Sequence, residues 1–205
     1  MWGLLLGFLI VVSGVPGTGK STLASRFVRE FRMVYVSLAE LALEEGAWML
    51  YDRDRRTYHI DFVNVARALR RRVRYGQRLL LEATELLTPW EAGIEPVAVF
   101  VLRCNPILLF ERLRAREWPL RKLVENIEAE FVGVVSWQAR RLFGDKRVCE
   151  IDTTRRSPED VFERAVRFLV DMDRGACDEI DWTLNDSVAD FVLELVNKLG
   201  NWNVE

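Results

Sequence analysis

Histidine and cysteine are scarce in this sequence of 205 residues, and their scarcity argues against several kinds of site. His59 is the only histidine and no cysteine lies near it, so we expect neither a zinc site nor a catalytic triad built on it. Cys104, Cys149 and Cys177 are odd in number and lack paired spacing. This pattern indicates a reducing compartment and predicts neither a disulfide framework nor a zinc site.

A large excess of charge of either sign is also absent. The formal net charge is −2, so global electrostatics do not require a nucleic-acid partner. The charge is unevenly distributed, because residues 176–205 contain seven acidic residues and one basic residue. Only four of the 29 basic residues are lysines, and Lys20 is the only lysine in the first 121 positions. Lys20 therefore stands out among the cations of this half of the chain.

No apolar run is long enough to span a bilayer, so we expect no membrane partner and place the protein in the cytoplasm. The apolar start, residues 1–12, resembles a signal peptide but lacks a basic leading region, and a glycine-rich loop follows it at once. An unbroken apolar run is also typical of a strand buried on both faces of a parallel sheet. We interpret this run as such a central strand.

Strand-like and helix-like segments alternate along the chain, which predicts an α/β fold with a parallel sheet covered by helices on both faces. After the first strand we predict strands at about 33–36, 78–82, 97–103 and 148–151. Helices are predicted at about 20–31, 61–75, 106–116, 119–143, 157–173 and 186–199, the last one closed by Gly200. Residues 37–60 are predicted to form short helix and loop, and residues 174–183 a linker.

Residues 14–21, G-V-P-G-T-G-K-S, fit the phosphate-loop pattern G-x-x-x-x-G-K-[ST]. In this loop backbone N–H groups surround a β-phosphate, Lys20 reaches the β- and γ-phosphates, and the Ser21 hydroxyl ligates Mg²⁺. The motif follows an apolar strand and opens a helix, whose N-terminal dipole favours the same anion. We expect the Lys20 ammonium to be exposed in the empty loop. The predicted ATP-binding residues are Gly17, Thr18, Gly19, Lys20, Ser21 and Thr22.

The phosphate loop alone does not separate kinases from GTPases, ATPases or transporter motors. A GTPase needs a guanine-binding segment of the type N-K-x-D, and neither Lys146 nor Lys198 lies in one. The short chain and the charged insert after the second strand favour a kinase that acts on a nucleotide or another small molecule.

Further motifs give the chain a resemblance to a known family. Besides residues 14–22 they are Y-V-S-L-A-E-L-A at 35–42, Tyr51-Asp52, Asp61, L-R-C-N at 102–105, L-R-A-R-E-W at 113–118 and K-L-V-E-N-I-E-A-E at 122–130. With these motifs the sequence resembles adenylate kinase isoenzyme 6 and its archaeal counterparts. The resemblance extends from residue 8 to about residue 172 and leaves the last thirty residues outside.

The resemblance implies a P-loop NTPase fold of three α/β/α layers with a five-stranded parallel sheet. It implies a nucleoside monophosphate (NMP)-binding segment at about 37–60 and a lid at about 115–125, within a kinase domain at 1–173. The implied activity is Mg²⁺-dependent transfer of the γ-phosphate of ATP to AMP or a related NMP, together with ATP hydrolysis. The family also implies a role in small ribosomal subunit maturation, through a small-subunit ribosomal protein or pre-ribosomal particle. A nucleotide-switched assembly ATPase, acting mainly as a binding protein, is the alternative.

Several family positions carry a different residue here. The family's asparagine after the second strand is Ser37, and its glycine in the lid is Glu117. The family's D-x-H at the end of the third strand is replaced by Glu82-Ala83-Thr84. Thr84 can donate or accept a hydrogen bond but cannot act as a histidine-like base. Such a base is not needed, because the acceptor phosphate is already ionised.

The resemblance and the chemistry of phosphoryl transfer together select the remaining candidate residues. Ser37, Glu40 and Asp61 are predicted to bind the NMP. Glu82 is predicted to hold Mg²⁺ with Ser21, partly through water, with Glu85 as the alternative carboxylate. Arg116 is predicted to clamp the transferring phosphoryl group, because arginine presents a planar fork to phosphate. The predicted catalytic residues are Lys20, Glu82, Thr84 and Arg116; weaker cationic candidates are Arg103, Arg112, Lys122, Arg140 and Arg141.

Residues 174–205 are predicted to form a linker and an amphipathic C-terminal helix. Apolar residues recur there at helical spacing, at Val188, Phe191, Val192, Leu195 and Leu199. We expect this helix to be a docking element outside the catalytic core. It would cover either the chain's own apolar surface or that of another copy or partner.

Overall fold

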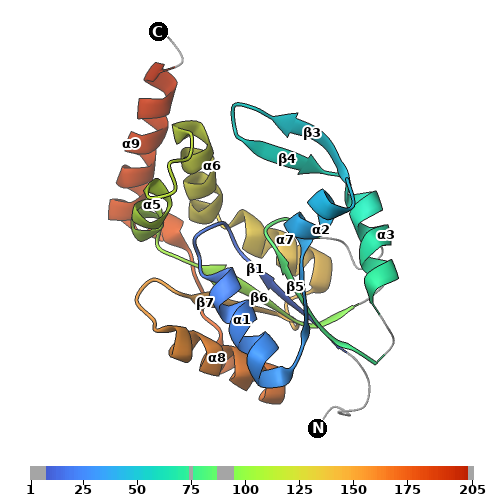
Figure 1. Ribbon diagram of the computed structural model, residues 1–205. Coiled ribbons are helices and arrows are strands. Elements are labelled where there is room, and N and C mark those ends of the chain that lie inside the picture. Colours follow the sequence, from blue (N-terminus) through green and yellow to red (C-terminus); the bar gives the residue numbers. More distant parts are fainter. Residues whose placement is uncertain (1–7, 74–75, 87–94, 203–205) are drawn as a thin grey trace.

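The computed structural model describes residues 8–73, 76–86 and 95–202 (Figure 1). Its centre is a five-stranded parallel sheet with the strand order β2-β5-β1-β6-β7. This confirms the predicted fold class. The strands are β1 (Phe8–Ser13), β2 (Val34–Ser37), β5 (Arg78–Ala83), β6 (Pro96–Arg103) and β7 (Val148–Asp152).

Helices cover both faces of this sheet, as Figure 1 shows. They are α1 (Lys20–Phe31), α2 (Leu38–Glu44), α3 (Phe62–Arg72), α5 (Pro106–Arg114), α6 (Leu120–Phe131), α7 (Val134–Phe143), α8 (Pro158–Asp171) and α9 (Asp186–Trp202). Residues 74–75 of the helix predicted at 61–75 lie outside the described residues. Among the residues that the structure describes, no helix is both long enough and apolar enough to cross a bilayer.

Strand β1 is the buried central strand that the apolar run predicts, although residues 1–7 of that run lie outside the described part. Leu9 and Val11 join the core that includes α3, α6 and α7. Ile10 and Val12 join the opposite core, which α1 and α8 cover. All four are at most 2% exposed, and burying each contributes roughly 1.5–3 kcal/mol. The loop that follows β1 therefore starts from a fixed point.

The prediction of short helix and loop at 37–60 is only half right. Helix α2 is present, but a β-hairpin follows it, made of β3 (Trp48–Asp52) and β4 (Thr57–Ile60). Its turn has no glycine or proline to mark it in the sequence. The Asp52 carboxylate accepts a hydrogen bond from the backbone N–H of Arg55, and Arg56 takes a positive φ of 48°. Side-chain hydrogen bonding thus makes a turn that composition does not indicate.

The single helix predicted at 119–143 is two helices, α6 and α7, which are separated at Gly133. Gly133 has a φ of 69°, and a Cβ there would lie 3.4 Å from Nη1 of Arg103. Arg103 is buried and binds Glu130 at 2.7 Å and Glu150 at 2.8 Å. The chain breaks here to wrap around this buried guanidinium. The prediction that Gly200 closes the last helix is also wrong, because α9 continues to Trp202.

Residues 174–183, predicted as a linker, contain a 3₁₀ helix at Arg174–Ala176, which contacts β7, and the start of a second one at Trp182–Leu184. Cys177 forms a disulfide with Cys149 of β7, so the prediction of no disulfide is wrong. The next residue, Asp178, accepts a hydrogen bond from the Asp152 backbone and pairs with Arg156 and Arg164. The two cysteines are 28 residues apart in the sequence, and only the fold shows that they lie close enough to form a bond.

Helix α9 covers the chain's own apolar surface by packing on α5 and α6 (Figure 1). Val188, Val192 and Leu195 are buried in the same core as α6 and α7. Phe191 contacts Phe110 of α5 edge to face, with ring centroids 5.5 Å apart. Ahead of the helix, the indole N–H of Trp182 donates to the buried carboxylate of Glu130 at 3.0 Å.

We predict that the Cys149–Cys177 bond stabilises the folded chain. Closing a loop of 28 residues should contribute about 3 to 4 kcal/mol, by restricting the unfolded state. Urea denaturation with and without reductant should show this loss. The matched control is Cys177→Ser, whose stability should be low in both conditions and insensitive to reductant. A parent protein with equal stability in both conditions would contradict the pairing.

We also predict that α9 contributes to the stability of the α/β core. Leu195 is 6% exposed and Leu193, on the same helix, is 60% exposed. Leu195→Ala should lower the free energy of unfolding by about 2 kcal/mol or more, because it leaves a cavity. Leu193→Ala should change it by less than about 0.5 kcal/mol. Equal effects of the two substitutions in urea denaturation would show that α9 does not pack as described.

Candidate active site

The phosphate loop connects β1 to α1, and two of its glycines, Gly14 and Gly17, are required by space as well as by backbone angle. Gly14 has a φ of 139°, and a Cβ there would lie 2.5 Å from the carbonyl oxygen of Leu102. Gly17 has a φ of 90°, and a Cβ would lie 2.9 Å from the side chains of Leu109 and Leu113. The loop is therefore pressed against β6 and α5. Any side chain at these two positions would displace it.

Side chains of the loop and its neighbours donate hydrogen bonds to the carbonyl groups of the loop. Thr18 is buried and its hydroxyl donates to the Val15 carbonyl at 2.9 Å. Thr153, after β7, donates to the Thr18 carbonyl at 2.9 Å, and Arg112 donates to the Gly17 carbonyl at 3.3 Å. The side chain of Thr18 thus shapes the loop. Gly17, Gly19, Lys20, Ser21 and Thr22 line the cavity beside it.

Lys20 differs from expectation because its side chain is only 8% exposed. Its ammonium donates to the Val15 carbonyl at 3.2 Å. Burial lowers the pKa of Lys20 to about 8; Glu82 partly offsets this effect and Arg116 adds to it. The loop folds around this cation, and the Val15 carbonyl supplies one hydrogen-bond acceptor for it. An arriving phosphate would relieve this poorly solvated charge.

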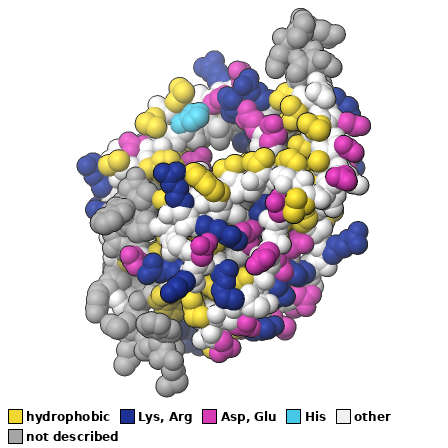
Figure 2. Space-filling model, turned by 180° about the vertical axis from the view of Figure 1, so that it is seen from behind, with side chains coloured by type: hydrophobic (Ala, Val, Ile, Leu, Met, Phe, Trp, Pro, Cys, Tyr) yellow, Lys and Arg dark blue, Asp and Glu magenta, His cyan; other side chains and the backbone are white. Residues whose placement is uncertain are grey.

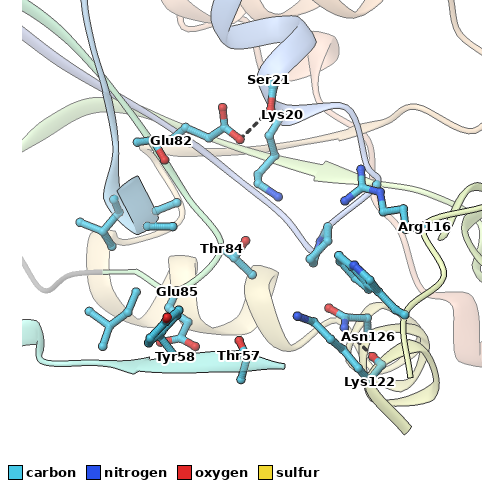
Figure 3. Close-up of a pocket in the computed structure, with 18 of the residues that line it drawn as sticks. Lys20, Ser21, Thr57, Tyr58, Glu82, Thr84, Glu85, Arg116, Lys122 and Asn126 are labelled. Atoms are coloured by element: carbon cyan, nitrogen blue, oxygen red, sulfur yellow. Dashed lines mark hydrogen bonds between the residues drawn. The ribbon is translucent and has the colours of Figure 1, made fainter. Parts of the chain in front are cut away.

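Glu82 lies at the carboxyl end of β5, between the loop and β2 (Figure 3). The Ser21 hydroxyl donates to Oε1 of Glu82 at 2.9 Å. The Tyr35 hydroxyl donates to Oε2, also at 2.9 Å. Partial burial and this carboxylate raise the pKa of Tyr35. A hydroxyl beside a carboxylate is a set of hard oxygen donors that suits Mg²⁺, with the remaining positions filled by water and phosphate.

A cavity of about 810 Å³ runs from the phosphate loop to α2 and the hairpin. In Figure 3, Lys20 and Arg116 point into the space at the loop end. Thr57, Tyr58 and Glu85 lie at the other end, and Thr84 lies between the two (Figure 3). The far wall is largely apolar: Leu38, Ala39, Ala42, Leu43 and Ile60 line it. The cavity is large enough for a drug-sized ligand. The phosphate loop lies at one end, and the cations Arg55, Arg56, Arg112, Arg116 and Lys122 are among the other lining residues.

The predicted NMP-binding residues are not all at this cavity. Ser37 lines it and also caps α2, because its hydroxyl accepts a hydrogen bond from the Glu40 backbone at 3.3 Å. Glu40 and Asp61 are not among its lining residues. Asp61 instead caps α3 by accepting from the Asn64 backbone at 3.1 Å. Sequence reasoning missed the β4 residues Thr57 and Tyr58, because it did not predict the hairpin.

Between α5 and the first turn of α6, in the segment predicted to be a lid, two cations lie on one aromatic ring. The guanidinium of Arg116 lies 5.2 Å from the ring centre of Trp118, and the ammonium of Lys122 lies 4.5 Å from it. All three residues line the cavity. Glu117, where the family has glycine, takes a positive φ of 52°, a conformation that costs a non-glycine residue about 1 kcal/mol. The backbone thus keeps the shape that glycine would favour.

The hairpin also contacts α6 directly, which closes one side of the cavity. Arg55 pairs with Asp52 in the hairpin turn at 2.7 Å and with Glu125 of α6 at 2.9 Å. Lys122 donates to the Arg56 carbonyl at 3.2 Å. The hairpin and α6 therefore meet through charged groups. Figure 2 shows exposed apolar side chains beside the single histidine, which lies on β4 of this hairpin.

The weaker cationic candidates divide into two groups. Arg112 and Lys122 line the cavity. Arg103 and Arg140 bind the buried carboxylate of Glu150, and Arg141 stacks on Trp137 at 5.1 Å. The latter three already have partners of their own. Arg112, whose second amino group donates to the Thr153 carbonyl at 3.1 Å, is fixed closest to the loop.

Comparison with known proteins identifies the family of this chain. The family model described as "AAA domain" matches residues 10–133. A protein named "Putative adenylate kinase" from Saccharolobus solfataricus is 32% identical over 91% of this chain and 94% of its own length. The Archaeoglobus fulgidus protein of the same name is 37% identical over 90% of this chain and 98% of its own length. Matches of this length must include part of residues 173–205, so the resemblance extends further than predicted.

Solved structures agree on the fold. A gluconokinase from Sinorhizobium meliloti matches 83% of this chain and 95% of its own, with 19% identity and a TM-score of 0.55. At that identity the match supports the P-loop kinase fold only. The sequence relatives are closer and cover nearly the whole chain. Together with the phosphate loop and the cavity beside it, they show that this chain belongs to the archaeal adenylate kinase family of P-loop phosphotransferases.

Proposed function

We propose that this protein transfers the γ-phosphate of ATP to a nucleoside monophosphate, AMP or a close relative, with Mg²⁺ as cofactor. The observation that carries the proposal is the shape of the cavity. It has a phosphate loop at one end, an apolar wall with a few polar groups at the other, and cations between them. This arrangement suits two nucleotides that meet through their phosphates. The names of the archaeal relatives support the same reaction.

ATP would bind with its β- and γ-phosphates in the loop. The backbone N–H groups of residues 17–22 and the Lys20 ammonium would surround them, replacing the Val15 carbonyl as the partner of Lys20. Ser21 and Glu82 would hold Mg²⁺, which supplies neutralisation of the phosphate charge when bound. Arg116 would approach the transferring group from the lid, leaving its stacking contact with Trp118.

The acceptor would occupy the end beneath α2 and the hairpin. Leu38, Ala42 and Ile60 offer an apolar surface to a base, and the Tyr58 ring lies beside them. Ser37 and Thr84 would donate hydrogen bonds to the acceptor phosphate or ribose. No side chain needs to remove a proton, because an acceptor phosphate whose second pKa is about 6 is already ionised at pH 7. Catalysis would rest on positioning and charge neutralisation.

The wider role that the family resemblance implies belongs to this proposal too. The protein would act in the cytoplasm, and in small ribosomal subunit maturation through a ribosomal protein or pre-ribosomal particle. Met49 and Leu50, on the hairpin, are 71% and 59% exposed and offer an apolar contact to such a partner. Intracellular proteins of hyperthermophilic archaea commonly contain disulfides, so the Cys149–Cys177 bond does not by itself exclude a cytoplasmic location.

The decisive experiment compares AMP-dependent ADP formation with simple hydrolysis. A kinase makes two ADP from one ATP and one AMP and releases no phosphate, whereas hydrolysis makes one ADP and one phosphate from each ATP. We expect ADP to exceed released phosphate when AMP is added, and a panel of NMPs should rank the acceptors. Phosphate release that equals ADP formation with every NMP would favour the assembly ATPase instead.

Lys20→Ala is the matched variant for this assay. It should reduce both ADP formation and ATP hydrolysis by at least about 100-fold, as expected for loss of a preorganised charge at a phosphoryl group. The fold should survive, because burial already disfavours the Lys20 charge. Thermal unfolding of the variant checks this point. Turnover within a few-fold of the parent would disprove the assignment of the loop.

The lowered pKa of Lys20 predicts how ATP binding depends on pH. In the empty protein Lys20 loses its proton above a pKa of about 8, and bound phosphates should raise that pKa again. ATP binding above pH 8 should therefore take up a proton, and affinity should fall by up to about tenfold per pH unit. Calorimetry at pH 9 in two buffers with different ionisation enthalpies measures the uptake. Lys198→Met is the control, because the Lys198 side chain is exposed on the outer face of α9, and this variant should show the same pH dependence as the parent. Equal affinity of the parent at pH 7.5 and pH 9.5 would contradict the prediction.

A further inference from the structure

We propose that Tyr35 is a positioning residue that fixes the Glu82 carboxylate for Mg²⁺, and that it does so through its hydroxyl. The inference rests on the proposed function, because it assumes that Glu82 serves the metal bound with ATP. It adds a residue on β2 to a site that otherwise consists of the phosphate loop and the end of β5. The evidence is the geometry around this one carboxylate.

Strand order explains why Glu82 can be held from two sides. Strand β5 lies between β1 and β2 in the sheet. Glu82 is paired with Val12 on β1 and with Ser37 on β2. The loop that follows β1 delivers Ser21 to one oxygen of the carboxylate, and β2 delivers Tyr35 to the other. Tyr35 precedes Ser37 by two residues, so both side chains point to the same face of the sheet.

The two hydrogen bonds together orient the whole carboxylate. Each is 2.9 Å long, and each uses a different oxygen. A glutamate has one more rotatable bond than the aspartate that the related family has here, so a single hydrogen bond would leave the group free to turn. The second hydrogen bond removes that freedom. Each oxygen still has a lone pair for a water molecule of the metal.

A purely structural role does not explain the location of Tyr35. Its side chain is 40% exposed on the edge strand β2, so core packing does not account for it. Its hydroxyl donates a hydrogen bond to Glu82 on the neighbouring strand. Removal of the hydroxyl should therefore leave the fold intact and change the carboxylate alone.

The test is Tyr35→Phe, with Mg²⁺-dependent ATP binding as the readout besides activity. ATP affinity in EDTA should stay within about twofold of the parent, because the loop is untouched. The Mg²⁺ concentration that gives half of the affinity gain should rise on the order of tenfold, as for loss of a hydrogen bond to a charged group. Mn²⁺ titration of the ADP complex, followed by electron paramagnetic resonance, should show the same weakening.

Tyr51→Phe is the matched control. Tyr51 contacts Tyr58 through its ring, with centroids 4.7 Å apart, and is not among the residues that line the cavity. It should behave like the parent. Glu82→Gln should raise the Mg²⁺ requirement at least as much as Tyr35→Phe. Tyr35 acts through Glu82. Adding Tyr35→Phe to Glu82→Gln should therefore change the Mg²⁺ requirement of the Glu82→Gln protein by less than about twofold.

The possible outcomes separate this inference from the proposed function. Equal Mg²⁺ dependence of Tyr35→Phe and Tyr51→Phe, with Glu82→Gln impaired, would overturn the role of Tyr35 and leave the metal role of Glu82 intact. Weakened ATP binding in EDTA, or multiplicative effects in the double variant, would also overturn it. Normal Mg²⁺ dependence of Glu82→Gln would overturn it at its premise. If the parent used no NMP but the variants showed the expected Mg²⁺ effects, the proposed transfer to an NMP would be rejected. The proposed role of Tyr35 would still stand.

Discussion

Burial of β1 on both faces is the constraint on which the rest of the molecule depends. A strand in that position has helices above and below and a partner strand on each side, so its end cannot move without disturbing two cores. The phosphate loop begins at that end, and Gly14 and Gly17 let it turn back against β6 and α5. The same strand order places Glu82 next to the loop. The order of the strands therefore provides the rigid scaffold and also places the phosphate loop and Glu82 side by side.

A second, smaller centre organises the half of the molecule that bears α6 and α7. Arg103, at the end of β6, binds the carboxylates of Glu130 and Glu150, and Trp182 donates to Glu130 as well. Burial raises the pKa of Glu130, opposed chiefly by Arg103. Removing one member of such a buried group typically costs about 3 to 5 kcal/mol, because a charge is left without a partner. This network connects β6, α6, β7 and the start of the tail, so the segment before α9 shares in the core.

Sequence reasoning succeeded where the determining interactions are local. The apolar run before G-V-P-G-T-G-K-S indicates both the central strand and the loop, since one motif contains the turn, the cation and the helix start. It failed where the determinant is distant. The hairpin turn depends on Arg55, which also reaches Glu125 on α6. The break at Gly133 depends on Arg103, thirty positions away in the sequence. The Cys149–Cys177 bond and the link from Tyr35 to Glu82 exist only once the strands are ordered.

The position of the disulfide divides the C-terminal third of the chain into two parts of different character. Cys149 and Cys177 enclose α8 completely within a covalent ring, and α8 packs on α1, the helix that starts at the phosphate loop. Helix α9 lies beyond the ring and is held on α5 and α6 by side-chain contacts alone. In the oxidised protein a detached α9 would remain tethered beside β7, while α8 and the loop-bearing helix keep their contact. The ring thus confines local unfolding of the tail to the side of the sheet that bears α5 and α6.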